Sequence, residues 1–170
     1  MSPVPGWSKR RWVEITERKI YRRIRKMKNI LIVTEKESHA RHFKKVLQTE
    51  PNNLFIIGVG GHIYTPDEHK YLPNITDADL TPCKRFTLSN GEVGFILGED
   101  AINATIKELN VLLSEQDFNV IINACDPDKN GNALFDYVNS LVHFDKTKIK
   151  RFNYINFDED HLREVYHAII

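Results

Sequence analysis

In Val120-Ile121-Ile122-Asn123-Ala124-Cys125-Asp126-Pro127-Asp128-Lys129-Asn130-Gly131, an apolar run is followed at once by a polar turn. The apolar half is typical of a buried strand, and apolar residues return at helical spacing after Gly131. Two carboxylates at the carboxyl end of a strand can point to one spot above the sheet, where open α/β sheets bind ligands. Mg²⁺ prefers such oxygen ligands. The turn therefore predicts a metal site, with a plain surface turn as the alternative, because Asp, Pro, Asn and Gly all favour turns.

Outward from this turn, short apolar runs alternate with segments of helical spacing. The runs predict strands over residues 30–34, 54–59, 85–88, 93–97, 120–125 and 148–156. Four apolar stripes predict helices: Ala40, Phe43, Val46 and Leu47; Ile102, Ile106, Leu109, Leu112 and Leu113; Leu134, Val138 and Leu141; Leu162, Val165, Tyr166 and Ile169. Ser89-Asn90-Gly91 favours a hairpin, and residues 64–83, which contain three prolines, are expected to be irregular. The alternation predicts an α/β fold, with a mostly parallel sheet covered by helices on both faces.

The composition is that of an ordinary globular protein. The chain has 170 residues, of which 41% are hydrophobic and 28% charged. No apolar run approaches the roughly 18 residues that span a bilayer, and the first residues contain no apolar signal core. Cys83 and Cys125 have no paired-ligand spacing, so we expect both to be reduced thiols in a cytoplasmic protein.

The net charge of +1 conceals a basic amino-terminal segment. Residues 1–28 carry ten Lys and Arg against two Glu, which gives +8 and leaves −7 for the remainder. Arg10, Arg11, Arg22 and Arg23 belong to this segment. Basic blocks of this density often contact nucleic acid. We therefore expect residues 1–26 to be a basic extension that binds nucleic acid, either as an amphipathic helix docked on the body or, alternatively, as a solvated arm.

Glu35 provides a possible partner for the two aspartates. It stands where the first predicted strand ends, and the carboxyl ends of parallel strands meet at one edge of a sheet. Glu35, Asp126 and Asp128 are therefore expected to converge, although an acid at the start of a helix is also favourable by itself.

Three motifs, in this order, resemble those of type IA DNA topoisomerases. Residues 30–41 contain Thr34-Glu35-Lys36-Glu37-Ser38 after a strand, residues 61–66 contain a Gly-His pair, and residues 126–131 are similar to the family's Asp-Pro-Asp-Arg-Glu-Gly. The resemblance covers residues 27–170 and implies a Toprim-like, Rossmann-like domain. It implies that Asp126 and Asp128 hold Mg²⁺ and that Glu35 acts as a general acid or a metal ligand.

The resemblance also implies a binding site for a DNA phosphate, with RNA as an alternative. Its contacts would be Lys36, which could also assist catalysis, and Ser38, His62 and Lys129. Asn130 stands where the family carries an acid, so it would be a weak, uncharged ligand. None of the six tyrosines has the family's Thr-Tyr-x-Arg surroundings, which implies that any cleaving tyrosine belongs to another domain or a separate subunit.

Three functions are compatible with these observations. The first is a topoisomerase-type Toprim domain, either a fragment or a subunit of a longer enzyme. The second is a stand-alone Toprim nuclease that uses Glu35, Asp126 and Asp128 with a metal. The third is a non-catalytic module that binds DNA or a partner protein.

Overall fold

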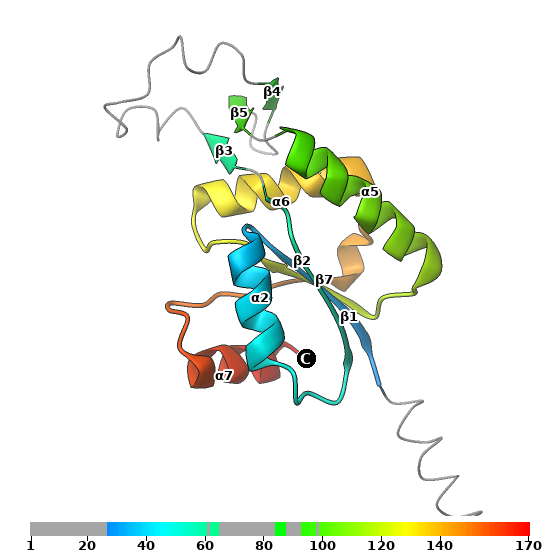
Figure 1. Cartoon of the computed structure of the whole chain (residues 1–170), viewed down its shortest axis with the longest axis vertical. Coiled ribbons are helices and arrows are strands. Elements are labelled where there is room, and N and C mark those ends of the chain that lie inside the picture. Colours follow the sequence, from blue (N-terminus) through cyan, green and yellow to red (C-terminus); the bar gives the residue numbers. More distant parts are fainter. Residues whose placement is uncertain (1–26, 61, 65–83, 88–92, 98) are drawn as a thin grey trace, which may run out of the picture.

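A four-stranded parallel sheet is the centre of the molecule (Figure 1). The structure is a computed structural model that describes residues 27–60, 62–64, 84–87, 93–97 and 99–170. Its parallel strands are β1 (Asn29–Thr34), β2 (Asn53–Gly58), β6 (Val120–Ala124) and β7 (Ile149–Arg151), in the order β2-β1-β6-β7. The register places Ile30 beside both Leu54 and Val120.

Helices cover both faces of this sheet. Successive residues of a strand point to opposite faces, so β1 presents apolar side chains to the helices on each side. Ile30 and Ile32 of β1 pack with α2 (Glu37–Val46) and α7 (Glu159–Ile169). Leu31 and Val33 instead pack with α5 (Glu99–Glu115) and α6 (Lys129–Val142). The predicted α/β fold, with a parallel sheet between helices, is confirmed.

A second, antiparallel sheet precedes α5 in the sequence. It consists of β3 (His62–Tyr64), β5 (Val93–Leu97) and β4 (Lys84–Thr87), in that order. The pairing of Thr87 with Val93 agrees with the predicted hairpin, whose turn lies outside the described residues. Residues 64–83, expected to be irregular, are described only at Tyr64, and Cys83 is not among the described residues. Cys125 is a buried free thiol.

Two predictions about the carboxyl-terminal half are wrong. The strand expected over residues 148–156 ends at Arg151, because the last residue of β6 that pairs with β7 is Asn123, which lies opposite Arg151. Leu141 is 40% exposed, whereas Val142 is buried, so the buried face of α6 is centred on Leu134, Val138 and Val142.

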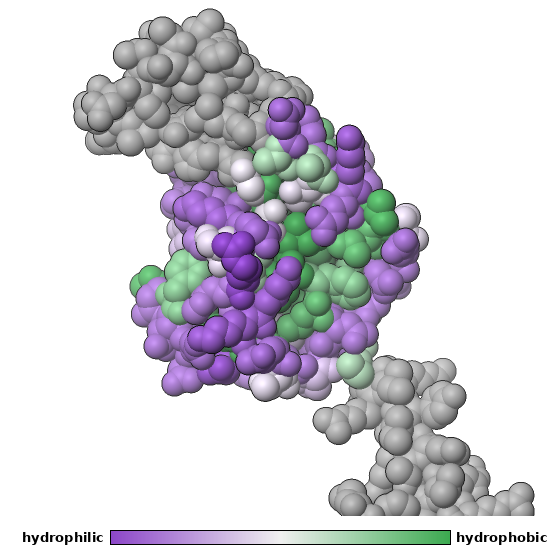
Figure 2. Space-filling model, in the orientation of Figure 1, coloured by the Kyte–Doolittle hydropathy of each residue, from purple (hydrophilic) through white to green (hydrophobic). Residues whose placement is uncertain are grey.

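No helix among the described residues has both the length and the apolar character to cross a membrane. Figure 2 shows apolar side chains gathered between α5 and the edge strand β2. Phe55 of β2 and Leu113 of α5 are partly buried against the core, and Val111 of α5 is exposed.

The order of the strands creates a switch point between β1 and β6, and we call the space above the carboxyl ends of these two strands the crevice. The chain leaves β1 toward α2 on one face and leaves β6 toward α6 on the other. The two connections therefore diverge above the carboxyl ends of neighbouring strands. Such a switch point is where open α/β sheets bind ligands.

Candidate functional site

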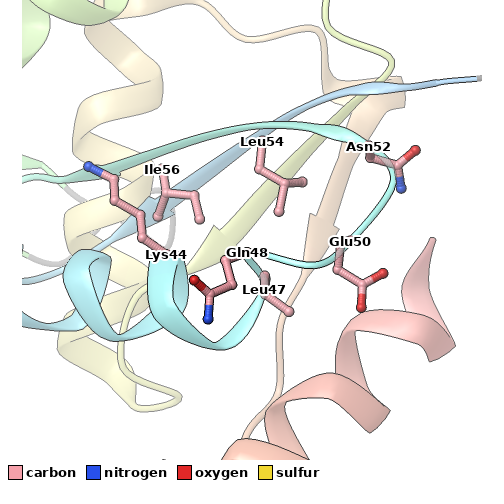
Figure 3. A pocket seen from close by; sticks show the side chains of 7 residues that line it. All are labelled: Lys44, Leu47, Gln48, Glu50, Asn52, Leu54 and Ile56. Atoms are coloured by element: carbon pink, nitrogen blue, oxygen red, sulfur yellow. The ribbon is translucent and has the colours of Figure 1, made fainter. Parts of the chain in front are cut away.

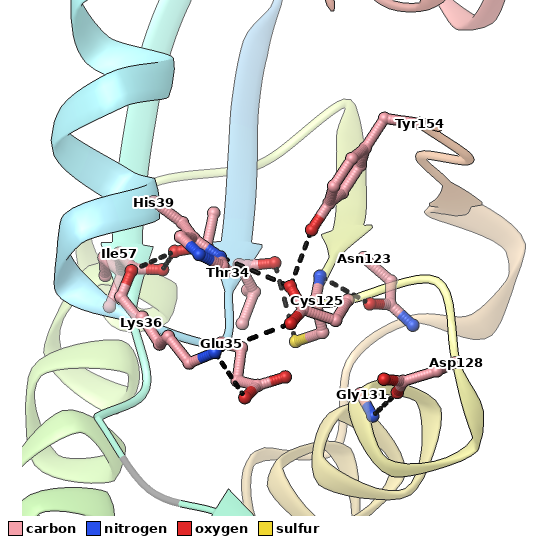
Figure 4. Close-up of polar contacts among 12 residues, drawn as sticks. Thr34, Glu35, Lys36, His39, Ile57, Asn123, Cys125, Asp128, Gly131 and Tyr154 are labelled. Carbon is pink, nitrogen blue, oxygen red and sulfur yellow. Dashed lines mark hydrogen bonds and ion pairs between the residues drawn. The ribbon is translucent and has the colours of Figure 1, made fainter. Parts of the chain in front are cut away.

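Two carboxylates and an ammonium group meet at this crevice (Figure 4). Thr34 lies beside Ala124 in the sheet, so Glu35 and Asp126 follow adjacent strand ends. The Lys36 ammonium lies 3.5 Å from Glu35 Oε1 and 3.6 Å from Asp126 Oδ2. Glu35 is only 3% exposed, and its backbone carbonyl accepts a hydrogen bond from the amide of Gly60 at 3.0 Å. The structure thus brings Glu35, Lys36 and Asp126 together.

The charge of Lys36 is favoured by these neighbours. Partial burial alone would lower its pKa, but the nearby carboxylates of Glu35 and Asp126 outweigh that effect, and the pKa of Lys36 is raised. An ammonium between two carboxylates is therefore a stable arrangement at neutral pH.

The other carboxylate oxygen of Asp126, Oδ1, forms a hydrogen bond with Tyr154. The Tyr154 hydroxyl donates a hydrogen bond to Asp126 Oδ1 at 2.7 Å. Burial, followed by this hydrogen bond to a carboxylate, raises the pKa of Tyr154. His39 Nδ1 lies 3.3 Å from the same oxygen without the geometry of a hydrogen bond, and its ring packs on Phe157. Burial lowers the pKa of His39, in spite of the neighbouring Asp126 carboxylate.

Asp128 points elsewhere. It is the N-cap of α6, and its Oδ1 accepts a hydrogen bond from the Gly131 amide at 2.7 Å. Among the described residues, no three His, Cys, Asp or Glu side chains are grouped closely enough to hold a metal ion. The sequence predicted that Glu35, Asp126 and Asp128 converge. The structure pairs the first two through Lys36 and uses the third to cap a helix.

The donor atoms nevertheless fit Mg²⁺ in kind. Glu35, Asp126 and Asp128 offer carboxylate oxygens, which hard cations prefer. Asn130 is 7% exposed, and its side-chain oxygen has no hydrogen-bond partner in the part of the chain that the structure describes. A buried amide oxygen without a donor is costly, and a cation would satisfy it.

Two close backbone contacts hold the turns that carry these groups. A β-carbon at Gly131 would lie 2.2 Å from the Asp126 carbonyl oxygen, so only glycine lets α6 begin so near the turn. A β-carbon at Gly58 would lie 2.6 Å from Glu37 Cα, so β2 presses equally closely on the turn after Lys36.

The remaining predicted phosphate contacts lie around this crevice or outside the described residues. Ser38 is exposed in the first turn of α2, and Lys129 is the exposed first residue of α6. Both helices begin at the crevice, and helix amino termini favour anions. His62 begins β3, but its side chain is not described. Arg10, Arg11, Arg22 and Arg23 also lie outside the described part of the chain.

The sequence did not reveal three residues that shape the site. Tyr154 is 28 positions from Asp126, and no local pattern connects the two. Arg151 donates to the Asp126 carbonyl at 2.7 Å and also to the Asn123 side chain, which holds the turn against β7. His39 was detectable in principle, because it lies three positions after Lys36 and so shares its side of α2.

A separate pocket lies at the opposite end of the sheet (Figure 3). It measures about 250 Å³ and is lined by Lys44, Leu47, Gln48, Glu50, Asn52, Leu54 and Ile56. Its carboxylate, Glu50, lies 3.3 Å from His167. Glu50 is the single acid among the residues that line this pocket.

Comparison with models of protein families yields a match. A family model described as the Toprim domain matches residues 30–159, which run from the second residue of β1 through the crevice to the beginning of α7. A comparison with curated proteins gave no match.

Proposed function

Because this chain belongs to the Toprim family, we propose that it is a Mg²⁺-dependent nucleic-acid-binding domain similar to that of type IA DNA topoisomerases. Toprim domains generally bind Mg²⁺ and act in nucleic-acid processing. The observation that carries the proposal is the position of the Lys36 ammonium, which lies between two carboxylates at the crevice. Two carboxylates from neighbouring strand ends, Glu35 and Asp126, hold one positive charge between them.

Each polar group at the crevice then has a role. Asp126 and Asp128 would hold Mg²⁺, with Glu35 as a further ligand or a general acid and Asn130 as an uncharged ligand. The ion supplies charge neutralisation and positioning for a phosphate group. Lys36, Ser38, Lys129 and His62 would contact that phosphate, at the edge where α2 and α6 begin.

A cleaving tyrosine would come from another domain or subunit. Tyr154 is the described tyrosine that reaches the crevice, and its hydroxyl already donates to Asp126. Its raised pKa disfavours the phenolate that attack on a phosphodiester requires. We therefore propose that this chain binds nucleic acid and metal but does not itself cut through a covalent tyrosine intermediate.

Binding of a fluorescent DNA oligonucleotide, with and without Mg²⁺, tests the proposal. We expect Mg²⁺ to strengthen binding of the full chain by about tenfold and Asp126→Asn to abolish that gain. Asp160→Asn, which removes a carboxylate that is 96% exposed, is the matched control and should behave like the wild type. An affinity for DNA that changes neither with Mg²⁺ nor with the Asp126→Asn substitution would refute the proposal. Degradation of the oligonucleotide that depends on Asp126 would identify a metal-dependent nuclease instead.

The basic extension has its own test. We propose that residues 1–26 add nonspecific affinity for the phosphate backbone. Deletion of these residues should weaken binding and reduce the dependence of affinity on salt concentration. An unchanged salt slope would show that the extension does not contact nucleic acid.

A further inference from the structure

The Lys36 ammonium occupies the position that a metal ion bound by both Glu35 and Asp126 would take. This ammonium is within 3.6 Å of both carboxylates. The Lys36 side chain is 53% exposed, so packing does not hold it there. Its flexible four-carbon stem lets the charged group leave without moving the backbone.

The two carboxylates are more fixed than the lysine. The Glu35 side chain is 4% exposed, so it has little room to turn toward water. Asp126 Oδ1 is held by the Tyr154 hydroxyl at 2.7 Å, and the oxygen that faces Lys36 is Oδ2. Two fixed carboxylates on neighbouring strand ends repel each other unless a positive charge lies between them.

We propose that Lys36 is an internal counter-ion that competes with Mg²⁺ for Glu35 and Asp126 and moves to a nucleic-acid phosphate when the metal binds. The inference rests on the function proposed above. An ammonium and a divalent ion repel each other at this distance, so they do not share the two carboxylates.

Binding of metal and of nucleic acid is then coupled. A phosphate that draws Lys36 away removes the competitor of the metal, so nucleic acid raises the affinity for Mg²⁺. Thermodynamic linkage requires Mg²⁺ to raise the affinity for nucleic acid by the same factor. A lysine at this position therefore reduces the repulsion between the two carboxylates in the free protein and makes the loaded site depend on both ligands.

Binding of Mn²⁺, followed by electron paramagnetic resonance on the full chain, tests this coupling without measuring any reaction. The titration is made with and without a short single-stranded DNA. Lys36→Met removes the charge and keeps the length of the side chain. Lys45→Met is the matched control, because Lys45 lies on the same helix and also forms an ion pair, with Glu159 at 2.7 Å.

Without DNA, we expect Lys36→Met to bind Mn²⁺ about tenfold more tightly than the wild type, and Lys45→Met to bind as the wild type does. DNA should tighten Mn²⁺ binding in the wild type and in Lys45→Met but not in Lys36→Met. Lys36→Gln should repeat the result, and circular dichroism shows that each variant is folded.

The outcomes separate the two proposals. If the wild type binds Mn²⁺ through Asp126 but Lys36→Met binds it equally or more weakly, the counter-ion role is wrong and the proposed function stands. If neither the wild type nor Lys36→Met binds Mn²⁺ in a way that Asp126→Asn reduces, both proposals are wrong.

Discussion

Replacing Gly131 by alanine tests whether the contact between α6 and the Asp126 turn shapes the site. An added β-carbon would lie 2.2 Å from the Asp126 carbonyl oxygen, 2.7 Å from its amide nitrogen and 2.9 Å from its carbonyl carbon. All three are backbone atoms, so no side-chain rotation relieves the overlap. The turn, the helix or both must move.

The expected cost follows from opposing effects. Relieving an overlap of this kind typically costs about 1–3 kcal/mol. Alanine gains at most about 1 kcal/mol over glycine in a helix. The movement also weakens the N-cap hydrogen bond that the Gly131 amide donates to Asp128, typically worth about 1 kcal/mol. We therefore expect a net loss of about 1–3 kcal/mol, or a fall in Tm of about 2–12 °C for a chain of this size.

Thermal and urea unfolding measure this loss, and Mn²⁺ binding shows its effect on the site. We expect Gly131→Ala to weaken Mn²⁺ binding, because Asp126 is the residue that must shift. Asn132→Ala is the control: the neighbouring residue is exposed, and its substitution should leave Tm unchanged or slightly raised. If Gly131→Ala melts at or above the temperature of the wild type, the close contact does not constrain the turn and the reasoning fails.

Three further substitutions test separate parts of the structure. Tyr154→Phe removes the hydrogen bond to Asp126 and should cost about 1 kcal/mol in urea unfolding; an unchanged midpoint would mean that the bond adds nothing. Phe43 is fully buried, and Phe43→Ala should cost about 3–5 kcal/mol by the same measurement, whereas a cost below about 1 kcal/mol would contradict its place in the core. In the folded chain, burial raises the pKa of the Tyr166 hydroxyl above its ordinary value of 10.0. As pH rises above 10.0, the unfolded chain therefore loses the hydroxyl proton before the folded chain does, and the free energy of unfolding falls. Tyr166→Phe should therefore lose less stability than the wild type between about pH 8 and about pH 10.5, and equal losses would show that Tyr166 is not responsible.

Much of the fold was predictable because the central strands are strongly patterned. Residues 30–34 and 120–124 are buried along their whole length and are apolar except at Thr34 and Asn123, as expected for parallel strands buried on both faces. The length of β7 was not predictable, because the apolar residues Phe152 and Tyr154 continue the pattern beyond the last residue that has a partner strand. A strand ends where its neighbour ends, and that information is not local.

The site was predictable only in part for the same reason. The positions of Glu35 and Asp126 could be predicted from topology alone, because each follows the end of a strand. The orientation of Asp128 depends on whether its carboxylate caps α6 or faces the crevice, and Asp is suited to both. The bond from Tyr154 depends on how the chain returns after β7, which no spacing in the sequence encodes.

The pairing of β1 with β6 places the two halves of the crevice far apart along the chain. Glu35 belongs to the β-α-β unit formed by β1, α2 and β2, whereas Asp126 belongs to the unit formed by β6, α6 and β7. Neither unit alone contains both carboxylates, so the site is complete only when β1 and β6 pair. The entropy of closing a flexible loop grows slowly with length, by about 0.6 kcal/mol for each doubling. Lengthening a flexible connection between the two units would therefore cost little stability, while the pairing of β1 with β6 keeps the two carboxylates together.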